Sequence, residues 1–313
     1  MVADPALEEA DFSDFMYQLA IGGQDRQQDK INAVVIDAVN SIAKLLDEMK
    51  EEYEEISKYM VANRLVINDV KKHLVVLGTR SIAARREQVS LQAGIHTIQP
   101  SKTETLLGCK ISEDLKWKQH LLSSDQSIIR HLTSRINGLC MVASRADFST
   151  RLMVANGIVM SRICYLIQLW GGCEGYLLHS IQVLMNRAAR SVTGLSGFTS
   201  TKRLMVSCGW LSVKQLVVYH SVTMIHKTLK SGSPTYMYKR LSSVYSYKTR
   251  QCTTGNIRQD ATFSSSSSLP RNSFRNRGAL DYNKVPVSIR AISNITTFKV
   301  KLRQWVKLNI DLE

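Results

Sequence analysis

The chain has little proline and glycine, with 5 and 16 of its 313 residues. That scarcity excludes a collagen-like or linker-like protein. Long apolar runs are also missing: the longest, 158–170, contains Arg162 and falls short of the about 20 residues that a bilayer-spanning helix needs. The first residues, Met-Val-Ala-Asp-Pro, have neither a basic n-region nor an apolar h-region. We therefore expect no secretory signal and no membrane partner.

Motifs for metal binding and catalysis are absent as well. The 6 cysteines form no Cys-x-x-Cys pair, and their irregular spacing fits neither a zinc ligand set nor a small disulfide scaffold. The 7 histidines form no His-Glu-x-x-His, and the chain has no Gly-x-Ser-x-Gly elbow and no Gly-Lys-Ser/Thr phosphate loop. The sequence predicts no metal site, no catalytic residue and no cofactor. It favours an intracellular protein with reduced thiols, in the nucleus or the cytoplasm.

Charge is abundant and unevenly placed. The chain has 41 Lys and Arg against 26 Asp and Glu, a formal net charge of +15. Residues 1–57 hold 14 acids and 4 bases, a net of −10, whereas residues 58–313 hold 12 acids and 37 bases, a net of +25. A body this basic indicates an anionic partner, and we expect RNA or DNA bound with little sequence preference.

Apolar residues at three- and four-residue steps, from Ile31 to Met60, predict an amphipathic helix over 31–60 whose other face is acidic. The helix packs on the core with its acidic face in water, or it pairs with a helix of another protein. Asn63 is expected to end it in the left-handed conformation.

Beyond the helix, β-like runs at 73–77, 95–98 and 105–111 predict a small antiparallel sheet or hairpin. Helical periodicity then continues from 114 to 230, with helices expected over about 117–141 and 151–170, from Leu177 to Gly194, and from Ser212 onward. Leu184 and Ala188 are placed on the inner face of the third of these helices. The predicted fold class is α+β, mainly α: a long helix with a small sheet, then an antiparallel bundle and a basic tail.

The predicted organisation has five parts. They are a poorly ordered stretch at 1–29, the helix and hairpin at 30–113, the bundle at 114–230, a Ser-rich linker at 231–270, and a basic tail at 271–313 with a terminal helix over 298–308.

Several motifs in order resemble the reverse transcriptase of non-LTR retrotransposons, over about residues 55–305. The motifs are Tyr59-Met-Val-Ala-Asn-Arg-Leu-Val-Ile-Asn68, Leu106-Leu-Gly-Cys-Lys-Ile111, Leu115-Lys-Trp-Lys-Gln-His120, Tyr165 to Gly172, Gln182 to Arg190, Phe274 to Gly278, Tyr282 to Pro286, Ile289-Arg290 and Phe298-Lys299. The resemblance implies that residues 30–113 are the end of a palm domain with a primer-grip hairpin and that 114–230 are a thumb. It also implies RNA or DNA as the partner.

The catalytic part of that family is not intact here. Its polymerases hold two Mg²⁺ ions with an upstream Asp and a tandem Asp pair. The nearest segment, Phe12-Ser13-Asp14-Phe15, puts a phenylalanine where the second carboxylate belongs. We therefore predict a degenerate or truncated reverse transcriptase fragment that binds nucleic acid without polymerising it. One alternative is an interaction protein that pairs through helix 31–60, and another is a polymerase completed by a second chain, so whether the chain is an enzyme stays open.

The candidate nucleic-acid contacts fall into three groups. Lys71, Lys72, Gly108 and Lys110 belong to the hairpin, where Gly108 follows from the resemblance. Lys116, Trp117 and Lys118 lead into the bundle, where Trp117 either stacks on a base or packs on the bundle. Arg187 and Arg190 lie three apart on one helix and can share a phosphate path.

Overall fold

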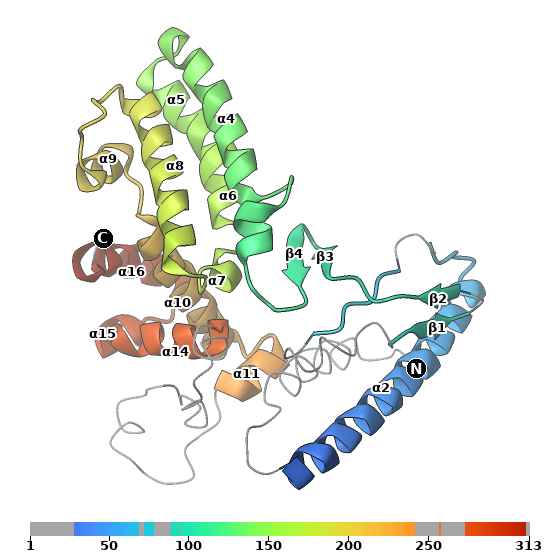
Figure 1. The fold of residues 1–313 in the computed structure, drawn as a ribbon. Coiled ribbons are helices and arrows are strands. Elements are labelled where there is room, and N and C mark those ends of the chain that lie inside the picture. Colours follow the sequence, from blue (N-terminus) through green and yellow to red (C-terminus); the bar gives the residue numbers. More distant parts are fainter. Residues whose placement is uncertain are drawn as a thin grey trace. The chain divides into compact units, whose positions relative to one another are not determined.

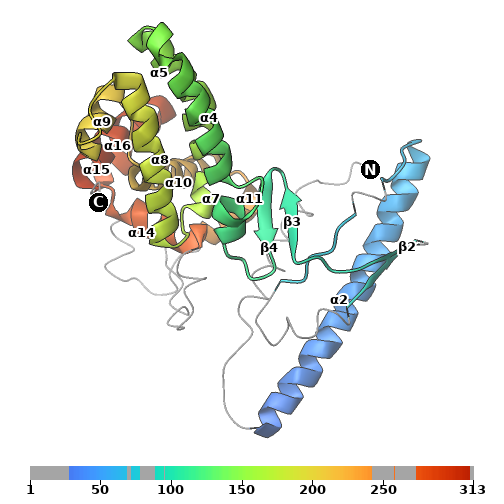
Figure 2. The same ribbon diagram turned by 45° about the horizontal axis from the view of Figure 1, so that its top comes forward.

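A computed structural model describes residues 28–68, 72–77, 89–94, 96–241, 257 and 273–310, with side chains from residue 44 onward (Figures 1 and 2). The chain divides at residue 116 into two compact units. We call them the helix–hairpin unit, described within 28–116, and the bundle, described within 117–310. The described elements are mostly helices, with two antiparallel sheets of two strands each. The predicted fold class is confirmed.

The helix–hairpin unit begins with α2 (Gln28–Ala62), which covers the predicted helix. Its end is a Schellman turn: the Leu65 amide donates to the Met60 carbonyl (2.8 Å) and the Arg64 amide to the Val61 carbonyl (3.0 Å). The left-handed residue is Arg64, with φ 57°, so its assignment to Asn63 is wrong. Asn63 instead donates its side-chain amide to the Tyr59 carbonyl at 2.8 Å, which occupies another carbonyl of the last turn.

Two hairpins follow α2. Strands β1 (Leu91–Ala93) and β2 (His96–Ile98) form the first, and β3 (Thr103–Leu106) and β4 (Cys109–Ser112) form the second. The turn of the second hairpin consists of Leu107 and Gly108, both with positive φ (50° and 74°), as a two-residue type I′ turn requires.

The apolar run at 73–77 is not a ladder strand. Leu74 makes one isolated parallel bridge to Pro100, and Leu74 and Leu77 are both buried. They lie three positions apart, and a strand would point residues at that spacing to opposite faces. The run is therefore an irregular extended segment, and its Leu74 packs in a small core with Val89 and Leu91.

The bundle is a run of helices of unequal length. They are η3 (Gln119–Ser123), α4 (Ile128–Val142), η4 (Ala143–Arg145), α5 (Phe148–Ala155), η5 (Asn156–Met160), α6 (Ser161–Cys164), α7 (Ile167–Trp170), α8 (Gly175–Thr193), α9 (Thr201–Cys208), α10 (Val213–Ser231), α11 (Thr235–Leu241), α14 (Phe274–Lys284), α15 (Val287–Arg290) and α16 (Ile295–Asn309). Helices α4 and α8 pack along each other, as both views show (Figures 1 and 2).

Two predicted helices are interrupted. The one at 117–141 is split into η3 and α4, with Ser127 capping α4. The one at 151–170 breaks at Leu166, which is left-handed with φ 53°. There the Trp170 indole donates to the Tyr165 carbonyl at 2.9 Å and so replaces a helical bond that the break removes. A side-chain bond between residues five apart stabilises this break, which no proline or glycine marks.

Glycines end two helices in different ways. Gly194 closes α8 with φ 70°, as expected of a left-handed cap. Gly171 ends α7 with φ −65°, so it is not needed for a left-handed turn. A Cβ there would lie 2.5 Å from the Ile167 carbonyl oxygen and 2.6 Å from Val217 Cγ2, so Gly171 allows α7 to approach α10 closely. On α8, Leu184 is half-buried and its neighbour Met185 is fully buried.

Helix α10 is the central element of the bundle and packs against α7, α8, α11, α14 and α16. Ser212 and Gln215 form a capping box at its start. The Gln215 amide also donates to the Ile310 carbonyl at 3.0 Å, at the end of α16. His226 stacks on Phe298 with ring centroids 3.6 Å apart, and its Nε2 donates to the Ile292 carbonyl at 2.9 Å. Helix α16 is thereby fixed to α10 along its length.

The segments predicted as linker and tail take part in this core. Phe298, Leu302 and Val306 of α16 have no exposed area, and Leu241 and Ile257, within 231–270, are buried. Lys299, Lys301 and Lys307 are exposed on α16, whereas Arg290 is buried and Arg277 is half-buried. A separate tail is therefore wrong for the described residues 273–310. The rest of the predicted linker, including the serine run, and the stretch 1–27 lie outside the described residues. In the part of the chain that is described, no helix has the length and apolarity to cross a membrane.

Candidate nucleic-acid interface

The hairpin lysines do not form one open cluster. Lys72 lies against α2: its Nζ donates to the Tyr53 hydroxyl at 2.5 Å and lies 4.6 Å from the ring centroid. Lys110 pairs with Thr105 across the hairpin and is half-buried, and Gly108 is exposed at the turn. Lys71 lies outside the described residues. The ammonium of Lys72 is engaged within the unit, which reduces its availability to a phosphate.

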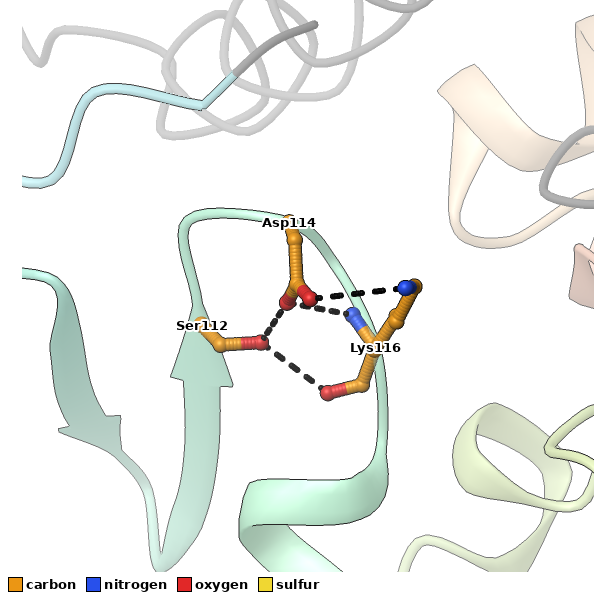
Figure 3. Close-up of polar contacts among 3 residues, drawn as sticks. All are labelled: Ser112, Asp114 and Lys116. Atoms are coloured by element: carbon orange, nitrogen blue, oxygen red, sulfur yellow. Dashed lines mark hydrogen bonds and ion pairs between the residues drawn. The ribbon is translucent and has the colours of Figure 1, made fainter. Parts of the chain in front are cut away.

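A compact polar turn follows the hairpin (Figure 3). The hydroxyl of Ser112 lies 2.6 Å from Asp114 Oδ1 and 3.0 Å from the Lys116 carbonyl, and the Lys116 amide donates to Asp114 Oδ1 at 3.1 Å. Partial burial acts to raise the pKa of Asp114, but the hydrogen bonds from Ser112 and Lys116 and the ammonium of Lys116 outweigh it and lower that pKa. The Lys116 Nζ lies 3.9 Å from Asp114 Oδ2, so its charge is partly compensated.

Trp117 and Lys118 belong to the bundle. Trp117 is half-buried against the bundle core, with its ring edge-on to His120 at 6.2 Å between centroids. Of the two roles considered for Trp117, stacking on a base or packing on the bundle, its position corresponds to packing. Lys118 is exposed. Of the pair, the lysine is the side chain that a nucleic acid would meet.

Arg187 and Arg190 of α8 differ in accessibility. Arg187 is exposed, and its Nη2 donates to the Asn137 side chain of α4 at 2.8 Å. Arg190 is half-buried, and its Nε is buried without a hydrogen bond. The shared helix face is as predicted, but only the Arg187 guanidinium is well exposed on it.

A second group of cations, of which only Lys299 belongs to one of the motifs, lies where α16 meets α10. Lys299, Arg303 and Lys307 follow one another at four-residue spacing, and Lys299 and Lys307 are exposed. Burial lowers the pKa of His220 on α10, and the nearby Lys299 and Arg303 lower it further. The signal that could have found this group is the pattern Lys-x-x-x-Arg-x-x-x-Lys, which puts three cations on one helix flank.

The described thiols and carboxylates offer little chemistry. Burial raises the pKa of Cys109 and Cys208 to about 11 and that of Cys173 to about 12, so these thiols stay protonated at neutral pH. Cys140 is exposed, with its sulfur 2.8 Å from the Ser191 hydroxyl. Among the described residues, no group of three or more His, Cys, Asp or Glu is placed to hold a metal ion.

Comparisons with known proteins add no family: no family model, no curated protein and no solved structure matches this chain.

Proposed function

We propose that this protein binds single-stranded RNA or DNA with little sequence preference, as a reverse transcriptase fragment that does not polymerise. The observation that carries the proposal is the charge of the bundle. Its described residues hold 23 Lys or Arg and 4 Asp or Glu. Those carboxylates can neutralise only a small share of the cations. An uncompensated basic surface of this kind attracts a phosphate backbone chiefly by counterion release.

The resemblance to non-LTR reverse transcriptases supports RNA or DNA as the partner. It also gives residues 30–113 the role of a palm and residues 114–230 that of a thumb. The proposal places the protein inside the cell, where nucleic acid occurs and where free thiols stay reduced. It requires no metal, because backbone binding depends on cations and shape, whereas polymerisation requires the carboxylate-held Mg²⁺ pair that the sequence lacks.

The test is a titration of the full chain with fluorescein-labelled rU20 and dT20, followed by anisotropy from 50 to 300 mM salt. If about six cations contact phosphates, log K should fall with log salt at a slope near −4, since each contact on a single strand contributes about −0.7. Absence of binding at 50 mM salt, or a slope of log K against log salt near zero, would refute the proposal.

The acidic face of α2 provides a second arm. Of the six exposed carboxylates among its described side chains, four can be neutralised with little effect on the fold. These are Glu51, Glu52, Glu54 and Glu55. Their simultaneous replacement by Gln should tighten binding at 50 mM salt, because a competing polyanion is removed. The gain should vanish near 1 M salt, where the Debye length is about 3 Å.

The alternative function, pairing of α2 with a partner helix, is favoured by one observation. The predicted inward residues Met49 and Ile56 are 37% and 52% exposed, and Val61 is 72% exposed. Met49 and Ile56 lie seven apart and so share one face, as in a helix–helix seam. The test is sedimentation of the full chain between 1 and 100 µM. Association that Ile56→Glu abolishes and Glu51→Gln, on the opposite face, leaves intact would support this alternative.

A further inference from the structure

Helix α16 is held in a single rotational setting on the bundle. Its residues Phe298, Leu302 and Val306 recur every four positions and are fully buried. At its far end the side chain of Gln215 donates to the Ile310 carbonyl at 3.0 Å, and near its start Phe298 stacks on His226. Because the core face is fixed in this way, the direction of every other side chain on the helix follows from the 100° step between residues.

Three cations follow the three core residues by one position. Lys299, Arg303 and Lys307 therefore lie along one flank, about 100° from the buried stripe and about 6 Å apart along the axis. Lys301 is exposed on the opposite flank, because it precedes Leu302 by one position. The helix thus carries a row of three positive charges on one flank and a single exposed lysine, Lys301, on the other.

The row adjoins residues of two other helices of the bundle, α9 and α10. The Arg303 guanidinium donates to the Gly209 carbonyl, the C-cap of α9, at 2.6 Å. Tyr219 and His220 of α10 are half-buried and edge-on at 5.3 Å between centroids. The positive charge of Arg303 lowers the pKa of Tyr219, against a larger rise from burial, and that of His220.

No described carboxylate compensates this row. The charges acting on His220 are those of Lys299 and Arg303, and the ion pairs of the bundle join Arg130 to Asp125 and Lys284 to Asp281. Like charges at four-residue spacing repel one another on a helix. A chain of phosphates would relieve that repulsion and would be held by charge-assisted hydrogen bonds.

We propose that this flank of α16, together with the adjoining edge of α10, is the surface on which the protein binds the phosphate backbone of a single-stranded nucleic acid. The inference rests on the proposed function and deepens it. It assigns Lys299 and Lys307 as direct phosphate contacts and Arg303 as a cation that also anchors the end of α9. The primer-grip hairpin, whose Lys72 is already bonded to Tyr53, is secondary on this assignment.

The experiment compares three single variants of the full chain with the wild type: Lys299→Gln, Lys307→Gln and Lys301→Gln. The three lysines are exposed on one helix and lose the same charge, so the third is a matched control. Circular dichroism and the melting temperature first establish that all three fold as the wild type does. Binding of labelled dT20 and rU20 is then measured from 50 to 300 mM salt.

Each flank variant should bind about eightfold more weakly at 50 mM salt and show a slope less negative by about 0.7, the contribution of one phosphate contact. Lys301→Gln should change the affinity less than twofold. A loss in Lys301→Gln as large as in Lys299→Gln would overturn the assignment and leave general charge attraction as the cause. Equal affinity of all four proteins would also overturn it while leaving the proposed function intact. Failure of the wild type to bind at 50 mM salt would instead refute the proposed function itself.

Discussion

Acidification should destabilise the bundle through His120. This imidazole is 3% exposed, and burial together with the nearby charge of Arg162 lowers its pKa from 6.5 to about 4. Below pH 6.5 the unfolded chain takes up a proton at this residue, whereas the folded chain does not until about pH 4. The stabilisation from a neutral His120 is therefore complete above pH 6.5 and is lost as the pH falls towards 4.

The pKa difference sets the size of the effect. At 1.36 kcal/mol per pKa unit, it amounts to about 3 kcal/mol of unfolding free energy between pH 7 and pH 4. That is a large part of the about 5–15 kcal/mol typical of a folded domain. The measurement is urea unfolding at a series of pH values, followed by tryptophan fluorescence. All 4 tryptophans lie in the bundle, so the signal reports this unit alone.

The matched control is His120→Gln, which keeps a polar side chain and removes the titration. Carboxylates and the other histidines titrate in both proteins, so the difference between the two pH profiles isolates His120. The wild type should lose about 3 kcal/mol more than the variant between pH 7 and pH 4. Parallel profiles would refute the reasoning, as would an NMR titration of the His120 ring with a pKa near 6.5.

Three further predictions concern the core, a close helix contact and catalysis. Met185→Asp places a charge at a fully buried position of α8 and should lower the free energy of unfolding in urea by several kcal/mol. Val183→Asp, at a position 50% exposed, should lower it by less than about 1 kcal/mol. Equal losses would show that the helix faces are misassigned. Gly171→Ala should cost about 1–3 kcal/mol because its Cβ meets Val217 and a carbonyl, while Gly157→Ala, with open space around it, should not lower the melting temperature. Purified protein with primed RNA, dNTPs and Mg²⁺ or Mn²⁺ should extend no primer, and extension that Asp14→Ala abolishes would contradict the absence of polymerase chemistry.

The parts of the fold that could be predicted are those whose signals are local. The capping pair Ser212 and Gln215, the terminal Gly194 and the apolar stripe of α8 are readable within a few residues, and these helices begin and end as expected. The break at Leu166 was not predicted, because no proline or glycine marks it, and the bond from the Trp170 indole to the Tyr165 carbonyl has no sequence motif. Periodicity continues across such a break and conceals it.

The tail was misassigned for a related reason. High positive charge dominates the composition of 271–313, yet Phe298, Leu302 and Val306 suffice to bury α16. For the candidate interface, the spacing of the α16 cations is visible in the sequence. Their neighbours are not, since Arg303 meets the Gly209 carbonyl, 94 residues away, only through tertiary packing. Sequence also cannot show that Lys72 is bonded to Tyr53, which depends on how an extended segment lies along α2.

The joining of α10 to α16 has a consequence for synthesis on the ribosome. Gln215 and Val306 meet in the core although 91 residues separate them. At the usual translation rate of about 5–20 residues per second, α10 waits roughly 5–18 s for its partner. During that interval the nascent bundle exposes the apolar face of α10 and the ring of His226. A product that ends between the two helices would keep that apolar face exposed, and we expect it to aggregate.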